Sequence, residues 1–168
     1  MIGRNVLVAL FASALAVSMT SVAAQEVGSK APAFDLPTAT KPVRLADLKG
    51  QVVYIDFWAS WCAPCKQSFP FMSEMQAKYG PRGFTVIGVN VDQKREDADK
   101  FLATTPAKFT IGFDTTSKVA EAYQPKGMPT SFLIGADGKV RAMHVGFKES
   151  NREEIEREIQ AALSAARK

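Results

Sequence analysis

The sequence predicts an α/β sandwich, in which helices flank a mixed central sheet. Two apolar runs, 51–58 and 83–91, carry β-branched and aromatic residues on both faces, as is typical of central strands covered on both sides. Stretches with helical spacing of apolar residues alternate with these strands, and a hairpin and a last helix close the chain. No internal repeat, low-complexity segment or linker in the sequence suggests a second domain.

The first 24 residues have the layout of a secretory signal peptide. Arg4 precedes an apolar stretch at 6–17, and small residues follow at 21–24. We expect cleavage after Ala23 or Ala24, which leaves residues 25–168 as the folded domain. The alternative is an uncleaved membrane anchor, although the apolar stretch is short for a spanning helix. Export would bring the chain into a compartment where disulfides form.

The composition narrows the classes of function. The chain has 168 residues, of which 46% are hydrophobic, so it can form one globular domain with a full core. Its net charge is only +4 and it has no run of Lys or Arg, so we expect no nucleic-acid binding. Two cysteines are too few for a four-cysteine zinc site, and we expect neither a metal nor another cofactor.

The first half of the domain is expected to build most of the sheet. In order, we expect a strand pair, a helical turn, a buried strand, a long helix and a second buried strand, at 33–36 with 43–45, 46–50, 51–58, 62–79 and 83–91. Pro70 lies inside the long helix and is expected to kink it, and Gly80 with Pro81 is expected to end it.

The second half alternates helices with shorter strands. We expect a surface helix, a strand, a short helix, a strand with its return strand, and a last helix, at 94–103, 110–113, 115–123, 131–134, 140–147 and 149–167. Asp137 and Gly138 predict a tight hairpin turn, because both residue types accept positive φ angles. Ser150 or Asn151 is expected to cap the last helix.

The only two cysteines, Cys62 and Cys65, stand where the first buried strand gives way to the long helix. A disulfide between residues so close adds little stability, so the pair favours redox chemistry over a structural role. At the start of a helix, free amides and the helix dipole favour the Cys62 thiolate, which is the attacking species. Cys65 lies one turn deeper and would resolve the mixed disulfide. The alternative is an inert pair in the core.

Asp56 is a carboxylate in an otherwise apolar strand, and its burial would cost free energy unless it is paired. We expect it beneath the cysteine helix, where it can accept the proton of Cys65; the alternative is an exposed position at the sheet edge. Trp61 is expected to cover the disulfide and shape a docking surface. Pro129, after Met128, begins a strand, where proline is tolerated, and the pattern leaves its cis or trans state open.

Residues 56–66 and 127–130, the latter followed by a strand, a hairpin and a helix, resemble the thioredoxin superfamily over about 28–165. The resemblance implies a thioredoxin-like fold, a cis Pro129 against the cysteine pair, and a Met128 backbone that pairs with an extended substrate. The substrate-binding residues implied in this way are Trp61, Ala63, Pro64, Met128 and Pro129.

Within the superfamily the chain is most similar to the exported TlpA/ResA-type thiol-disulfide oxidoreductases. The N-terminal strand pair and a strand-helix insertion at about 94–123 fit that branch. Ser68 stands where many of these relatives carry glutamate, whereas Asp56 matches the buried acid of thioredoxin. Thioredoxin's neighbouring lysine is replaced by Gly88. We therefore predict a thioredoxin-like proton path on a TlpA-like frame, with the pKa of Asp56 raised by burial.

The resemblance implies a periplasmic, monomeric disulfide reductase that is recharged by an inner-membrane electron donor of the DsbD or CcdA kind. Substrates in such families include apocytochrome c and copper-site cysteines. One alternative is a disulfide donor of the same fold. Another is a Sco-like copper chaperone, which would need a histidine such as His144 and usually carries three residues between its cysteines. A peroxiredoxin is disfavoured because its cysteine motif is missing.

Overall fold

The computed structural model describes residues 26–167, so the predicted signal peptide at 1–24 lies outside the described residues. A five-stranded mixed sheet forms the centre, in the order β5-β4-β3-β6-β7. Its strands are β3 (Val52–Trp58), β4 (Phe84–Asn90), β5 (Thr110–Phe113), β6 (Thr130–Ile134) and β7 (Val140–Val145). Among residues 26–167, no helix has the length and apolar character needed to span a membrane.

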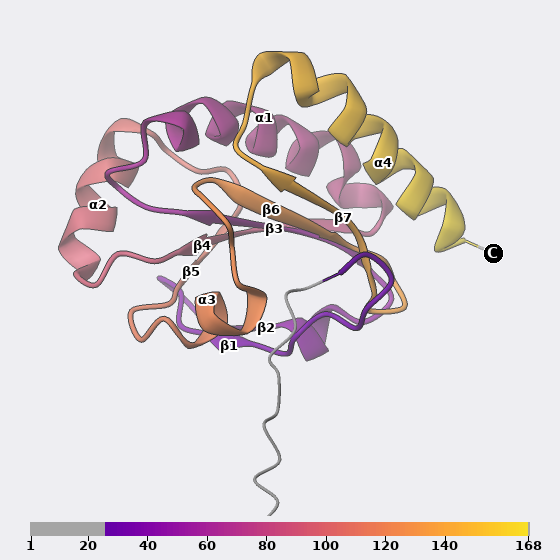
Figure 1. Ribbon diagram of the computed structural model, residues 1–168, viewed down its shortest axis with the longest axis horizontal. Helices are drawn as coiled ribbons and strands as arrows, with labels where there is room; N and C mark the ends of the chain where they lie inside the picture. Colours follow the sequence, from indigo (N-terminus) through magenta and orange to yellow (C-terminus); the bar gives the residue numbers. More distant parts are fainter. Residues whose placement is uncertain (1–25, 168) are drawn as a thin grey trace, which may run out of the picture.

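The remaining elements cover the two faces of this sheet. They are the antiparallel pair β1 (Asp35–Leu36) and β2 (Val43–Arg44), and the helices α1 (Ala63–Tyr79), α2 (Arg95–Thr104), α3 (Lys118–Tyr123) and α4 (Arg152–Ala165). Three short 3-10 turns lie at Leu45–Leu48, Gly80–Arg82 and Glu149–Asn151. Figure 1 shows α1 and α4 above the sheet and α3 with the β1–β2 pair below it. The predicted thioredoxin-like layers, strand pair and insertion are confirmed.

Strand direction determines where the functional residues meet. β3, β4 and β5 run parallel, whereas β6 is antiparallel to β3. The carboxyl end of β3 therefore lies at the same sheet edge as the amino end of β6, with Thr130 opposite Phe57. Residues 59–62 and 127–129, which are far apart in the sequence, consequently emerge at one edge.

The alternation of side chains along β3 fills two separate cores. Tyr54 and Trp58 point toward α1 and α4, and the ring centroids of Trp58 and Phe69 are 5.0 Å apart. Phe57 points toward α3 and the N-terminal strand pair, with its ring centroid 5.9 Å from that of Phe132. Because β3 is buried along its whole length, a polar side chain on this strand is enclosed.

The hairpin turn between β6 and β7 differs from the tight turn that Asp137 and Gly138 predict. Only Gly138 has a positive φ, and the loop spans Gly135 to Lys139, whose backbone groups bond each other at 2.9 Å. The Asp137 carboxylate stabilises this wider loop, because it accepts hydrogen bonds from the Lys139 amide and from Arg141. At the end of β6, the register of its pairing with β7 shifts by one residue.

The predicted cap of α4 is also wrong. Asn151 occupies the N-cap position but makes no side-chain cap hydrogen bond. Its backbone is already helical, with φ −91° and ψ −8°, because a 3-10 turn over Glu149–Asn151 leads directly into the helix. An N-cap side chain normally needs an extended backbone to reach the first free amides. The Asn151 amide oxygen instead accepts a hydrogen bond from Ser150.

We expect the Phe132→Ala substitution to lower the free energy of unfolding by about 3–5 kcal/mol. Phe132 is fully buried and touches the rings of Phe57 and Tyr123, so its removal leaves a cavity between β6 and α3. Urea unfolding measures the change, with the exposed Val27→Ala as a control that is expected to change stability by less than about 0.5 kcal/mol. Equal losses in the two variants would contradict this account of the core.

Candidate functional site

The cysteine pair sits at the junction of β3 and α1. Cys62 is the N-cap residue of α1 and Cys65 lies in its first turn, and the two form a disulfide with an S–S distance of 2.03 Å. Pro64 lies in the first turn, where its missing N–H costs no helical hydrogen bond. Because the first amides of a helix carry partial positive charge, this position favours a thiolate once the disulfide is reduced.

Both cysteines are almost completely covered, while the residues around them face solvent. Cys65 is fully buried and Cys62 is 3% exposed. Trp61 is 71% exposed, and Ala63 and Pro64 are exposed as well. The disulfide is therefore recessed beneath an exposed surface formed by Trp61, Ala63 and Pro64, as a docking surface requires.

Asp92 holds the loop that leads to the cysteines. Its carboxylate accepts hydrogen bonds from the Ser60 amide at 2.9 Å and the Ser60 hydroxyl at 3.0 Å, and from the Asn90 side chain at 2.8 Å. The sequence analysis did not identify Asp92 as part of the site. The signal was present, because a polar residue just after a parallel strand lies at the edge where such sheets carry their sites.

Asp56 is buried in the middle of the sheet, with only 2% of its surface exposed, so the alternative of an exposed edge position is wrong. It lies on the α1 side of β3, between Tyr54 and Trp58, in the core that also contains Cys65. Its Oδ2 atom has no hydrogen-bond partner among the described residues. Desolvation by burial raises the pKa of this carboxyl well above its ordinary value.

The register of the sheet confirms that the neighbour of Asp56 on β4 is Gly88, so no lysine stands beside it. A side chain at Gly88 would collide with Ile111 and Phe109, and Trp58 already lies close to this position. Apolar rings thus occupy this side of Asp56. The carboxyl keeps its raised pKa because it has no cationic partner there.

The segment of Met128 and Pro129 reaches the same edge as the cysteines. The peptide bond between them is cis, as the resemblance implied, and Pro129 is buried. The Pro129 carbonyl accepts a hydrogen bond from the Gly146 amide at 2.7 Å. Among the described residues, the Met128 backbone has no hydrogen-bond partner. It is therefore available to an incoming extended chain.

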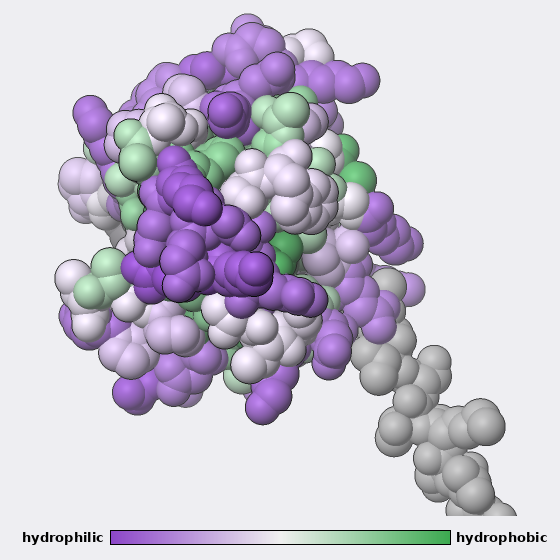
Figure 2. Space-filling view, turned by 90° about the vertical axis from the view of Figure 1, so that its left-hand side faces the viewer, coloured by the Kyte–Doolittle hydropathy of each residue, from purple (hydrophilic) through white to green (hydrophobic). Residues whose placement is uncertain are grey.

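Val145 adds an apolar side chain to this edge that sequence reasoning missed. It lies opposite Thr130 at the end of β7 and is 53% exposed. Figure 2 looks at the edge where β3 ends, and it shows small apolar areas within a largely hydrophilic surface. The valine lies beside Gly127, which directly precedes the segment of Met128 and Pro129.

Ser68 and His144 lie close to the site but hold other partners. Ser68 is buried and donates a hydrogen bond to the Cys65 carbonyl at 3.0 Å. His144 lies on β7, two strands from β3, with its Nε2 atom 2.7 Å from Glu158. Within residues 26–167, no group of three or more His, Cys, Asp and Glu side chains is placed to hold a metal ion. The geometry gives no support to a copper site.

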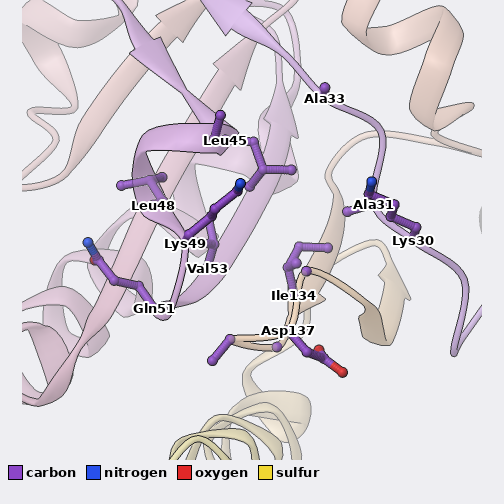
Figure 3. A pocket seen from close by; sticks show the side chains of 14 residues that line it. Lys30, Ala31, Ala33, Leu45, Leu48, Lys49, Gln51, Val53, Ile134 and Asp137 are labelled. Atoms are coloured by element: carbon purple, nitrogen blue, oxygen red, sulfur yellow. The ribbon is translucent and has the colours of Figure 1, made fainter.

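A cavity of about 430 Å³ lies at the opposite edge of the sheet. Figure 3 shows Leu45 and Lys49 on one side of it and Lys30 and Ile134 on the other. It borders the beginning of β3 and the end of β6, and so is remote from the cysteine edge. The cavity is therefore separate from the cysteine pair.

Comparisons with known proteins agree with this geometry. A family model described as Redoxin matches residues 26–159. Thiol-disulfide oxidoreductase ResA of Bacillus subtilis is 38% identical over 114 residues, which cover 67% of this chain and 64% of that protein. ResA of Bacillus cereus is 34% identical over 136 residues, covering 80% of this chain and 78% of that protein.

A solved structure gives the same result. A crystal structure from Chlorobium tepidum, described as a putative thiol:disulfide interchange protein DsbE, is 54% identical with a TM-score of 0.81. The match covers 83% of this chain and 99% of that one. The family match spans most of the described residues and includes the disulfide-forming pair at the helix start. The chain therefore belongs to the Redoxin family of the thioredoxin superfamily and is a ResA-like thiol-disulfide oxidoreductase.

Proposed function

We propose that the protein is exported and reduces disulfides of periplasmic proteins. The observation that carries the proposal is the buried, unpartnered carboxyl of Asp56 on the face of β3 that α1 and its cysteines cover. Its raised pKa lies closer to that of a thiol than the pKa of an ordinary carboxyl does, which favours proton exchange between the two groups. The signal-peptide pattern of residues 1–24 supports export.

In the proposed reaction, a substrate strand pairs with the Met128 backbone and brings its disulfide to Cys62. The Cys62 thiolate attacks one substrate sulfur, so a mixed disulfide forms and the other substrate sulfur leaves as a thiolate. Cys65 then passes its proton to Asp56 and attacks the Cys62 sulfur. The Cys62–Cys65 disulfide forms, and the second substrate sulfur leaves. Two electrons have passed from the pair to the substrate.

Recharging the enzyme requires a dithiol. We propose an inner-membrane donor of the DsbD or CcdA kind, which reduces the Cys62–Cys65 disulfide by the same exchange in reverse. Candidate substrates are apocytochrome c and copper-site cysteines, whose thiols must be reduced before metal or haem is attached. The protein is proposed to act as a monomer. A disulfide donor would use the same residues, so the direction depends on the reduction potential.

Trapping tests the reaction and names its partners. We expect Cys65→Ser, expressed as the full chain with its N-terminal segment, to accumulate mixed disulfides at Cys62 in the periplasm. Without Cys65 the mixed disulfide cannot be resolved, so non-reducing gels and mass spectrometry identify the captured proteins. The double variant Cys62→Ser with Cys65→Ser is the control and should capture none. Equal capture by both variants would contradict attack by Cys62.

The reduction potential of the wild-type protein decides whether it reduces or oxidises its substrates. Its reduction potential, measured in glutathione buffers, is expected to be strongly reducing. A potential near about −120 mV, which is typical of a strong disulfide donor, would overturn the reductase and favour the donor.

Asp56→Asn tests the proton acceptor. The variant is expected to slow mixed-disulfide resolution at least about tenfold and to remove the pH dependence of this step. It should also stabilise the protein at neutral and alkaline pH. Burial raises the pKa of Asp56 in the folded state, so the contribution of this one carboxyl to stability is most favourable below the unfolded-state pKa of about 4 and is lost as the pH rises through the folded-state pKa.

Stopped-flow kinetics and urea unfolding at several pH values measure both effects of Asp56→Asn. If Asp56→Asn resolves the mixed disulfide at the wild-type rate at every pH from mild acid to mild alkali, Asp56 is not the acceptor. A gain in stability that is equal at acid and alkaline pH would show that its charge is not the cause.

Val145→Ser tests the extent of the docking surface. We expect it to raise KM for a protein disulfide several-fold with little change in kcat, because the side chain would touch the substrate away from the reacting sulfurs. Val27→Ser is the matched control, because Val27 is also exposed, at 67%. It lies beside the beginning of β7, whereas Val145 lies at the end of β7. Identical KM values for the two variants would remove Val145 from the docking surface.

A further inference from the structure

A row of polar side chains crosses the sheet from Asp56 to the surface. Asp56 on β3 lies opposite Ser131 on β6, and Ser131 lies opposite His144 on β7. Residues opposite each other in antiparallel strands point to the same face, with Cβ atoms about 5 Å apart. Glu158 of α4 completes the row, because its Oε2 atom is 2.7 Å from His144 Nε2. We call Asp56, Ser131, His144 and Glu158 the polar row.

The exposure of the side chains increases along the row. Asp56 and Ser131 are buried, the His144 side chain is 14% exposed, and that of Glu158 is 34% exposed. The row therefore extends from the interior carboxyl toward solvent. A proton that Asp56 takes from Cys65 needs such a connection, because the carboxyl has almost no contact with solvent of its own.

Among the described residues, the neighbours of Asp56 toward β4 and toward Trp58 cannot relay a proton. On the β4 side stands Gly88, with Phe109 and Ile111 beyond it. Trp58, the next residue of β3 on this face, carries an indole N–H without a partner among the described residues. An indole N–H can donate but cannot accept, so it cannot pass a proton on. The titratable groups on this face near Asp56 are Tyr54, His144, Glu158 and the cysteine pair.

Tyr54 orients the hydroxyl of Ser131. The Tyr54 phenol donates a hydrogen bond to Ser131 Oγ at 2.7 Å, which leaves the proton of Ser131 free to be donated elsewhere. Burial, together with the negative charges of Asp56 and Glu158, raises the pKa of Tyr54, so the phenol stays protonated and remains the donor. The hydrogen bond to Ser131 places Tyr54 beside the polar row.

The hydrogen bond to Glu158 orients His144. In the tautomer that carries its proton on Nε2, His144 donates to Glu158 and leaves Nδ1 able to accept a proton. Imidazole exchanges protons readily at neutral pH. Among the described residues, no hydrogen bond joins Asp56 to Ser131 or Ser131 to His144, so rotation of these side chains or bridging waters must close both gaps.

We propose that Ser131 and His144 relay protons between Asp56 and solvent during resolution of the mixed disulfide, which rests on the function proposed above. Cys65 gives its proton to the Asp56 carboxylate. Asp56 passes a proton to Ser131 Oγ as the Ser131 hydroxyl proton moves to Nδ1 of His144. The His144 Nε2 proton then leaves to solvent beside Glu158. Asp56 is then a carboxylate again, and the net result is the transfer of one proton from Cys65 to solvent. The sequence reverses when the disulfide is reduced.

The test separates the two chemical steps. Reduced protein is mixed with Ellman's reagent in a stopped-flow instrument, where attack by Cys62 releases one coloured thiolate and attack by Cys65 releases a second. We expect Ser131→Ala and His144→Ala to slow the second release about tenfold at neutral pH and to leave the first unchanged. Added imidazole should restore the second release in His144→Ala, and Ser131→Thr, which keeps the hydroxyl, should behave like the wild type.

Two controls remove similar groups outside the polar row. Ser164→Ala and Glu154→Gln lie on the exposed face of α4 and should leave both releases unchanged. The relay is overturned if both Ser131→Ala and His144→Ala keep the wild-type second release. It is also overturned if the slow release in His144→Ala persists with imidazole, because this residue would then only support the structure. No second release in the wild type would contradict the redox function itself.

Discussion

The antiparallel pairing of β6 with the central strand β3 is the constraint on which the site depends. It brings the amino end of β6 to the edge where β3 ends, so Met128 and Pro129 meet the loop that carries Cys62. The same pairing sets Ser131 opposite Asp56. A shift of one residue would turn Ser131 to the other face and separate these groups. One register thus supports both the docking edge and the polar row.

Burial of the Asp56 carboxyl without a cationic partner costs folding free energy. The proposed proton transfer gives this burial a use. An exposed or ion-paired carboxyl would remain ionised at neutral pH and would be a weak base toward a thiol. Burial raises its pKa, as the proposed exchange of a proton with Cys65 requires. The enclosed position also requires an exit for the proton. Trp58 and the rings near Gly88 close one side, which leaves the direction of Ser131.

The docking surface and the chemistry are separated in depth. Trp61 and Val145 are exposed at the edge, whereas Cys65 and Asp56 are buried beneath it. Asp92 connects the two levels by holding Ser60, so the cysteine loop has a defined conformation before any substrate arrives. Such preorganisation lets an extended chain bind by its backbone with little sequence preference.

The layers of the fold, the cysteine pair and the burial of Asp56 could be predicted because each depends on residues that are close in the chain. Apolar periodicity defines strands and helices, and an acid within an apolar strand must be enclosed. The roles of Ser131, His144 and Val145 could not be predicted in this way. They depend on which strand lies beside which and in what register, although Asp56 and Ser131 are far apart in the sequence. Only the packed sheet decides such contacts, because local patterns do not specify the long-range partner of a strand.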